Sequence, residues 1–259
     1  QSGQESLEGL DRWLESRLQG HIAKTTEALE RFQTRQALQE AFFAIESDLK
    51  WYMRRLPPGS SGSAVLEDLF SVWVRLLAPF IPFTCEFLWK EIGGAGLVSY
   101  APWPVADPRA INSQAELSEE LLARTVEDIE SILKIIQLTP SAITIYTAPS
   151  WKKKVFSTVA AAEDRTAVIR EIMGDAEMRK RGKEVPDVVR QCTTLIHRLP
   201  PQVVAELSRE IPDELAIFSA ATGFLSKEFS VPVSVCEAGE SSHAKAAFAL
   251  PFKPAIVIE

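Results

Sequence analysis

Side chains able to perform catalysis are few and widely spaced in this sequence of 259 residues. Histidine and cysteine occur three times each, at His21, His197, His243, Cys85, Cys192 and Cys236. These residues lack the CxxC, HxxxH or HExxH spacing that is typical of metal sites. Carboxylates such as Asp128 and Glu130 fall on the solvated face of a predicted helix, where general acid–base catalysis is disfavoured. We therefore expect neither a catalytic residue nor a metal site in this chain.

Positive charge is concentrated between Trp151 and Lys183, although the whole chain carries a net charge of −7. Nine basic and five acidic residues lie in this segment. Basic clusters beside an aromatic residue suit contact with RNA phosphates and stacking of a base, whereas a solvated surface is the alternative. The predicted RNA-binding residues of the two clusters are Lys152, Lys153, Lys154, Arg179, Lys180, Arg181 and Lys183.

A third basic cluster, Lys50–Arg55, closes a predicted helix. Cations at that end of a helix complement the helix dipole. We expect Trp51 and Tyr52 to pack in the core, because large aromatic residues are mostly buried. Arg54 and Arg55 are less easily explained by packing, so they are further candidates for contact with RNA.

The chain ends in an apolar segment, Pro254–Glu259, without a polar tail. Terminal residues usually fray, so an apolar end indicates that these residues pack or are used. Glu259 offers a side-chain carboxylate and an α-carboxylate, both of which only accept hydrogen bonds.

The first half of the sequence has the apolar periodicity of long helices. One stripe runs from Leu7 to Phe32, and a second helical stretch begins near Thr34 and stops at Pro57. A third runs from about Ala64 to Ile92 and is expected to kink or split at Pro79 and Pro82. Gly93 then follows as a predicted helix C-cap. Long helices joined by short breaks form an antiparallel bundle.

The proline-rich segment Ala101–Pro108 is the predicted domain boundary, which gives a bundle over residues 1–109 and a second domain over 110–259. The second domain has helical periodicity at Glu116–Gln137, Trp151–Ala161, Ala167–Arg179, Val185–Leu199 and Asp213–Phe229. β-branched segments predict strands at Ala142–Thr147, Val231–Cys236 and Ala255–Ile258. The fold class is therefore mainly α, a helical bundle followed by a smaller α+β domain.

Composition and terminal residues bear on the place of the chain in the cell. Apolar residues make up 46% and charged residues 24%, as in ordinary globular proteins, and no apolar run approaches the length of a membrane span. The odd number of cysteines suits a reducing compartment. Because the first residue is Gln1 rather than Met, we expect the tail of a longer cytoplasmic protein.

Several of these segments together resemble leucyl-tRNA synthetases of the archaeal and eukaryotic-cytosolic type. Leu76–Phe83 followed by Glu86–Trp89 resembles the bundle motif of class I aminoacyl-tRNA synthetases, with Phe83 where the motif often has His. The accompanying segments are Thr34–Gln39, Asp48–Tyr52, Ile217–Phe229 and the ending Lys253–Glu259. The resemblance covers essentially the whole chain, and the lack of long appended extensions looks archaeal.

The resemblance implies that the bundle is an anticodon-binding domain and that the second domain binds the elbow and long variable arm of tRNA(Leu). It also implies that Lys253, Ile258 and Glu259 take part in that binding. The parent would be a monomeric leucine–tRNA ligase. Its ATP and Mg²⁺ would be held by a catalytic domain outside this sequence, so the chain itself would hold no cofactor and contact no membrane.

Two alternatives stay open from the sequence. The chain could be the tail of the synthetase for isoleucine, valine or methionine, whose bundles share the pattern of Pro79 and Pro82. It could also be a helical scaffold that binds other proteins, which the acidic total charge would suit.

Overall fold

The computed structural model describes residues 2–57, 64–136, 140–162 and 165–259. The chain divides into two compact units, Gln1–Glu116 and Leu117–Glu259. The predicted boundary between functional domains, at residues 109 and 110, stays a prediction. The fold class is confirmed, since the described chain is mainly helical with a small mixed sheet near its C-terminus.

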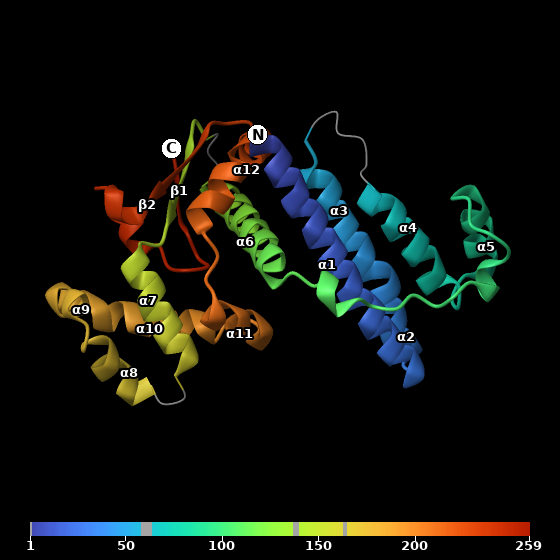
Figure 1. Cartoon of the computed structure of the whole chain (residues 1–259). Helices are drawn as coiled ribbons and strands as arrows, with labels where there is room; N and C mark the ends of the chain where they lie inside the picture. The colour runs from blue at the N-terminus through green and yellow to red at the C-terminus, as the bar shows by residue number, and fades with distance from the viewer. Residues whose placement is uncertain (1, 58–63, 137–139, 163–164) are drawn as a thin grey trace. The chain divides into compact units, whose positions relative to one another are not determined.

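The first unit is built on one long helix, α1, against which α2, α3 and α4 pack, while α5 packs on α4 (Figure 1). Its helices are α1 (Ser2–Glu30), α2 (Thr34–Leu38), α3 (Ile45–Arg55), α4 (Ala64–Leu77) and α5 (Pro82–Glu91). The predicted apolar stripe of α1 is buried at Leu10, Leu14, Leu18 and Ile22. A single face of α1 therefore supplies much of the core of this unit.

Proline and glycine divide the helices of the first unit as predicted. The third helical stretch splits into α4 and α5, and Pro82 is the first residue of α5, where a helix needs no N–H donor. Gly93 follows α5 with a φ of +80°, a conformation that costs glycine little. Phe32 was expected on the buried stripe, and this was wrong. It lies in the turn after α1 with a φ of +58°, and 89% of it is exposed.

The helix predicted from Thr34 runs from α2 to α3 through one π-helical turn, Gln39–Ala44. Such a turn bonds residue i to i+5, so it holds one residue more than an α-helical turn. The carbonyl oxygen of Ala41 in this turn accepts a hydrogen bond of 2.7 Å from Trp73 Nε1 of α4. The π-helical turn therefore also contacts the next helix of the bundle.

Two carboxylates of this second stretch meet a buried histidine of α1. The His21 Nδ1 atom lies 3.1 Å from Glu40 Oε2, and its Nε2 atom lies 2.8 Å from Asp48 Oδ2. Arg17 Nε donates to the same oxygen of Asp48 over 2.8 Å. Burial alone raises the pKa of Asp48, but the hydrogen bond from His21 and the charge of Arg17 outweigh burial and lower this pKa. Charged hydrogen bonds thus fix α3 to α1.

The second unit holds the remaining helices and the sheet. Its elements are α6 (Ser113–Ile136), β1 (Ile143–Thr147), α7 (Ser150–Ala161), α8 (Arg165–Ile172), α9 (Ala176–Arg181), α10 (Glu184–Ile196), α11 (Pro201–Arg209), α12 (Glu214–Phe229), β2 (Val233–Glu237) and β3 (Ala255–Ile258). Only α6 begins before the division between the units. The helix α12 packs on β1 and β2, and α7 packs against α8, α10 and α11 (Figure 1).

The sheet has the order β2-β1-β3, with β2 parallel and β3 antiparallel to the central strand. Ile143 is paired with Ile258, and Tyr146 with Ala255. The start of β1 therefore lies beside the end of the chain, whereas the end of β1 leads directly into α7. All three predicted strands are confirmed, with small changes in their limits.

A buried carboxylate joins the end of β1 to the turn that precedes β3. Glu214, at the start of α12, accepts hydrogen bonds from the backbone N–H of Phe252 at 2.5 Å and of Ala148 at 3.3 Å. Burial raises the pKa of Glu214 to about 6, although these hydrogen bonds and the charge of Lys153 partly offset the effect. One side chain thus holds two connections of the sheet.

The helices of the second unit differ from prediction at two places. The helix expected over Ala167–Arg179 is broken between α8 and α9, because Gly174 and Asp175 form a turn and Asp175 Oδ1 caps α9 by accepting from Glu177 N at 2.7 Å. The helix α11 was not predicted. Pro201 at its first position marks a helix start that the sequence pattern already contained.

We predict that Asp48→Ala lowers the free energy of unfolding by about 1–3 kcal/mol, because it removes the carboxylate that accepts hydrogen bonds from His21 Nε2 and Arg17 Nε. Urea unfolding followed by circular dichroism measures the change. The control is Asp68→Ala on the exposed face of α4, for which we expect a change within about 0.5 kcal/mol. Equal effects of the two substitutions would show that the His21 contacts do not stabilise the unit.

We predict that Glu214 makes stability depend on pH in a direction unusual for a carboxylate. Its folded pKa of about 6 lies above the ordinary value of 4.5, so protonation stabilises the folded state. This contribution is complete below the ordinary pKa and is lost as the pH rises through about 6, and it amounts to about 2 kcal/mol. Urea unfolding from about pH 4 to pH 7 should show the loss in the wild type and not in Glu214→Gln. The exposed control Glu240→Gln should keep the wild-type profile; matching profiles for Glu214→Gln and the wild type would refute the assignment.

Candidate nucleic-acid interface

The first basic cluster lies in the first turn of α7, immediately after the central strand. Pro149, at the N-cap, accepts hydrogen bonds through its carbonyl oxygen from Lys152 N at 2.9 Å and Lys153 N at 3.3 Å. Because β1 ends at Thr147, only a short connection separates the sheet from this turn. The directions of the side chains of Trp151–Lys154 are therefore set by the sheet.

Lys152 points into the domain rather than towards solvent. It is 4% exposed, and its Nζ donates to the carbonyl oxygens of Ala247 at 2.5 Å and Ala249 at 2.8 Å. Burial lowers its pKa, although the negative charge of Glu184 acts in the opposite direction. The expectation that Lys152 contacts phosphate therefore needs correction, since its ammonium group holds the segment Ala244–Phe248 against α7.

Trp151 is also buried and does not present its ring for stacking with a base. It is 7% exposed, and the guanidinium carbon of Arg181 lies 4.5 Å from the centre of its ring. A cation over an indole ring is attracted by the electron-rich face. Trp151 thus holds Arg181 on the domain, and Arg181 has one face occupied by the ring.

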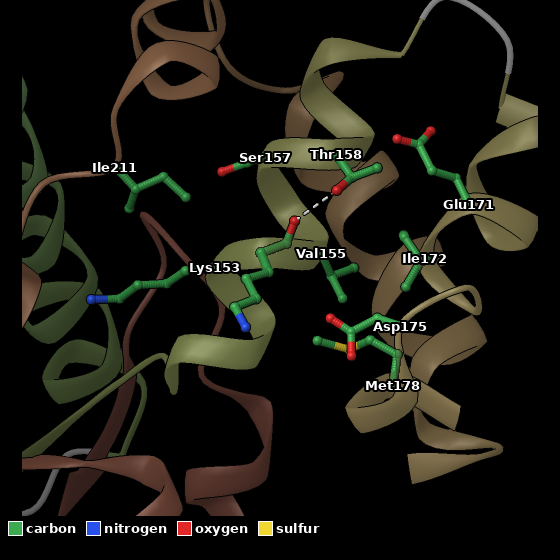
Figure 2. Close-up of a pocket in the computed structure, with 10 residues that line it drawn as sticks. Lys153, Val155, Ser157, Thr158, Glu171, Ile172, Asp175, Met178 and Ile211 are labelled. Carbon is green, nitrogen blue, oxygen red and sulfur yellow. Dashed lines mark hydrogen bonds between the residues drawn. The ribbon is translucent and has the colours of Figure 1, made fainter. Parts of the chain in front are cut away.

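The two basic clusters, distant in sequence, are brought together by Glu177 of α9. Lys154 Nζ lies 3.7 Å from Glu177 Oε2, and Arg181 Nη2 lies 3.5 Å from Glu177 Oε1. Both contacts are partly solvated, so each contributes little to stability. Their geometry nevertheless shows that Lys154 and the cluster Arg179–Lys183 share one surface. We call it the cationic surface, formed by Lys154, Arg179, Lys180, Arg181 and Lys183, whereas the predicted Lys153 lies on the other side of α7 (Figure 2).

Most of the cationic surface is open to solvent. Lys154, Arg179, Lys180 and Lys183 are exposed, whereas Lys153, outside this surface, is half-buried. Arg179 Nη2 donates to the carbonyl oxygen of Gly174 at 3.2 Å, which restrains the guanidinium group. The chain turns at Gly182, with a φ of +53°, before Lys183 leads into α10. The sequence predicts these cations as a group, but it carries no signal for the bridging role of Glu177.

The C-terminal candidates lie at both ends of β3. The exposed Lys253 precedes the strand, near the end of β1 and the start of α7. Glu259 follows the strand, where its N–H donates to Ala142 O at 3.0 Å and its carbonyl oxygen accepts from Ser141 N at 2.6 Å. Ile258 is half-buried and Glu259 is exposed. The last two residues thus pair with the start of β1, at the opposite end of that strand from the cationic surface.

The two arginines of the first unit have different environments. Arg54 is exposed, with its guanidinium carbon 5.8 Å from the centre of the Trp51 ring. Arg55 is buried, with 8% of it exposed, so it packs inside the unit and is not placed to contact RNA as predicted. Tyr52 is fully buried, as expected, and Trp51 is half-buried against the core.

The described residues also bear on metal binding and on membrane insertion. They contain no group of three or more His, Cys, Asp or Glu side chains placed to hold a metal ion. Across the same described ranges, none of the helices combines the length and the apolar character needed to cross a bilayer.

Comparison with known proteins places the chain in a family. Residues 11–178 match the family described as the anticodon-binding domain of tRNA ligase. The leucine–tRNA ligase of Methanococcoides burtonii is 35% identical over 98% of this chain and 27% of its own length. Those of Pyrococcus abyssi and Pyrococcus furiosus are 38% and 39% identical over 98% of this chain and 25% of theirs. The chain thus spans about a quarter of the length of the curated relatives it matches. The resemblance predicted from the sequence is confirmed: the chain belongs to the anticodon-binding domain family of tRNA ligases and corresponds to the C-terminal portion of leucine–tRNA ligases of the archaeal type.

Proposed function

We propose that this chain binds tRNA(Leu) and that its second unit grips the elbow and long variable arm. The observation that carries the proposal is the cationic surface, where cations of α7 and α9 gather in a chain whose net charge is −7. An anionic protein that concentrates exposed Lys and Arg on one surface attracts polyanions there and repels them elsewhere. Because the relatives are named leucine–tRNA ligase, a transfer RNA is the polyanion that we expect to bind there.

The exposed cations would neutralise phosphates and so position the RNA without reading its sequence. Lys154 and Lys180 are suited to this because their ammonium groups extend from the helix surface into solvent. Arg179 is restrained by Gly174, so it loses less conformational freedom on binding. Lys253, at the same end of the sheet, would extend the track of cations.

Selectivity would come from the end of the chain. The carboxylates of Glu259 repel phosphate but accept hydrogen bonds from amino or imino groups of unpaired bases. The five residues of β1 span about 17 Å, which separates this end from the cationic surface. A single tRNA is long enough to contact both, so one end of the sheet would hold its backbone and the other would read bases at the tip of the variable arm.

The first unit would dock along the tRNA through its surface, with Arg54 as the candidate cation. Arg55 is no longer a candidate, because it is buried. The proposed parent is an ATP-dependent leucine–tRNA ligase in the cytoplasm. Its chemistry with ATP and Mg²⁺ would take place in a part of that protein outside this chain.

We predict that Lys154→Ala combined with Lys180→Ala flattens the salt dependence of binding to a tRNA(Leu) transcript. Each lost phosphate contact should reduce the slope of log K against log salt concentration by about 0.7–0.9. The slope for the double variant should therefore be smaller in magnitude by about 1.5. Fluorescence titration at several salt concentrations measures the slope. The matched control, Lys134→Ala combined with Lys227→Ala, removes two exposed lysines from α6 and α12 and should keep it. An unchanged slope in the first double variant would remove α7 and α9 from the interface. Binding insensitive to salt in the wild type would favour a protein-binding scaffold.

We predict that removing Ile258 and Glu259 reduces selectivity for tRNA(Leu) more than general affinity for RNA. Truncation also deletes hydrogen bonds to Ser141 and Ala142, so a second variant carries two glycines after Glu259. This extension keeps the backbone pairing of Glu259 and displaces only the terminal carboxylate. Titrations should show that the ratio of affinities for tRNA(Leu) and for a tRNA with a short variable arm falls about tenfold in both variants. Proportionate losses for every tRNA would contradict a reading role for these residues.

A further inference from the structure

An open cavity of about 610 Å³ lies between α7, α8 and α9, beside the cationic surface (Figure 2). Its apolar floor comprises Val155, Ile172 and Met178, and Ile211 lines it from the other side of α7. The first three of these are nearly fully buried, so they form a fixed surface rather than a flexible one. Cavities of 300–1,000 Å³ with an apolar floor and a few polar groups are typical of binding sites for small molecules or single groups.

The rim of the cavity carries charges of opposite sign on its two sides. Lys154 and Thr158 stand one turn apart on α7, and the Thr158 hydroxyl donates to the Lys154 carbonyl at 3.0 Å. Figure 2 shows Glu171, Ile172 and Asp175 facing Thr158 from α8 and the turn after it, with Lys153 and Ile211 on the other side of α7 in this view. The cavity therefore presents a cation on one wall and carboxylates on the other.

The two carboxylates are not equivalent. Asp175 uses Oδ1 to cap α9 by accepting from the Glu177 N–H at 2.7 Å. The exposed carboxylate of Glu171 makes no hydrogen bond or ion pair with any residue in the described part of the chain. Both oxygens of Glu171 are therefore available to a ligand that offers two hydrogen-bond donors side by side.

We propose that this cavity holds one unstacked guanine nucleotide of the bound RNA, with Glu171 accepting hydrogen bonds from the guanine N1–H and N2–H groups. The ring would lie on the apolar floor next to Met178, and Lys154 would contact the adjacent phosphate. The proposal rests on the proposed function, because it names one nucleotide that the cationic surface would hold. Arg179 and Lys180 would bind phosphates on the strand beyond it.

The acceptor chemistry of Glu171 selects guanine over the other bases. An ionised carboxylate only accepts hydrogen bonds, and its two oxygens match two parallel N–H donors. Guanine presents such a pair on its Watson–Crick edge. Adenine and cytosine present one amino group beside an acceptor nitrogen, and uracil presents one imino group between two carbonyl oxygens. Each of these bases would place an acceptor against the carboxylate, which costs affinity.

Size argues against a free amino acid as the occupant. An amino acid such as leucine would satisfy both charged walls, but it is far smaller than a cavity of about 610 Å³. A nucleotide fills more of this volume and continues into the cations of α9. Free leucine therefore enters the test as the competing outcome.

The test compares fluorescein-labelled pentaribonucleotides, UUGUU and the same chain with inosine at the centre, on the full 259-residue chain. Inosine lacks only the N2 amino group, so the guanine pentamer should bind about tenfold more tightly in anisotropy titrations. Glu171→Gln should abolish this preference, because an amide replaces one acceptor by a donor. The matched control Glu91→Gln, an exposed residue of α5, makes the same charge change outside the cavity and should keep the preference.

A second measurement locates the bound base. With ¹³C-labelled methionine methyl groups, the resonance of Met178 should shift when UUGUU is added, whereas that of the exposed Met53 in the first unit should not. Equal binding of guanine and inosine pentamers, a preference that survives Glu171→Gln, or a Met178 signal that shifts with leucine alone would overturn the proposal. Any of these results with salt-dependent tRNA(Leu) binding intact would reject the guanine site and leave the proposed function standing.

Discussion

The structure of the second unit depends on the burial of one ammonium group. Lys152 gives two of its hydrogen bonds to the carbonyl oxygens of Ala247 and Ala249 and thereby fixes the segment before β3 to the first turn of α7. Burying a charge is costly unless it is well bonded, so the geometry of both elements is tightly constrained. With Lys152 directed inward, Lys154 is directed outward, where it meets α9 through Glu177. The same constraint that holds the fold together therefore sets the direction of the exposed cations.

Glu214, which has the opposite charge, also fixes two connections of the sheet through its hydrogen bonds. It accepts hydrogen bonds from the N–H group of Ala148, directly after β1, and from that of Phe252, shortly before β3. Both ends of the central strand are thus held independently, one by this carboxylate and the other by the pairing of Glu259 with Ser141 and Ala142. The strand acts as a fixed spacer between the cationic surface and the end of the chain. A ligand that contacts both must match that spacing.

The long periodic helices, the break at Pro79 and Pro82 and the β-branched strands were predictable, because each follows from the chemistry of neighbouring residues. The inward direction of Lys152 was not, since its partners lie about a hundred residues further along the chain and are backbone carbonyls, which carry no sequence signal. The contacts of Glu177 and Glu214 likewise join residues that are distant in the sequence. The break at Gly174 and Asp175 was visible as a turn dipeptide that caps α9, whereas the exposure of Phe32 depends on a turn geometry that periodicity does not report. Local rules therefore identified most elements, and tertiary contacts decided which charges reach the surface.

The π-helical turn between α2 and α3 fixes the rotational phase of the helix that follows it. Each residue of an α-helix advances the side-chain direction by about 100°, but the wider turn over Gln39–Ala44 absorbs one extra residue without passing that rotation on to α3. Asp48 therefore still faces His21 and Arg17, and Tyr52 still enters the core. A chain lacking one residue of this stretch would form an ordinary α-helical turn and keep the phase of α3. Homologues one residue shorter there should thus retain the contacts of Asp48 and Tyr52.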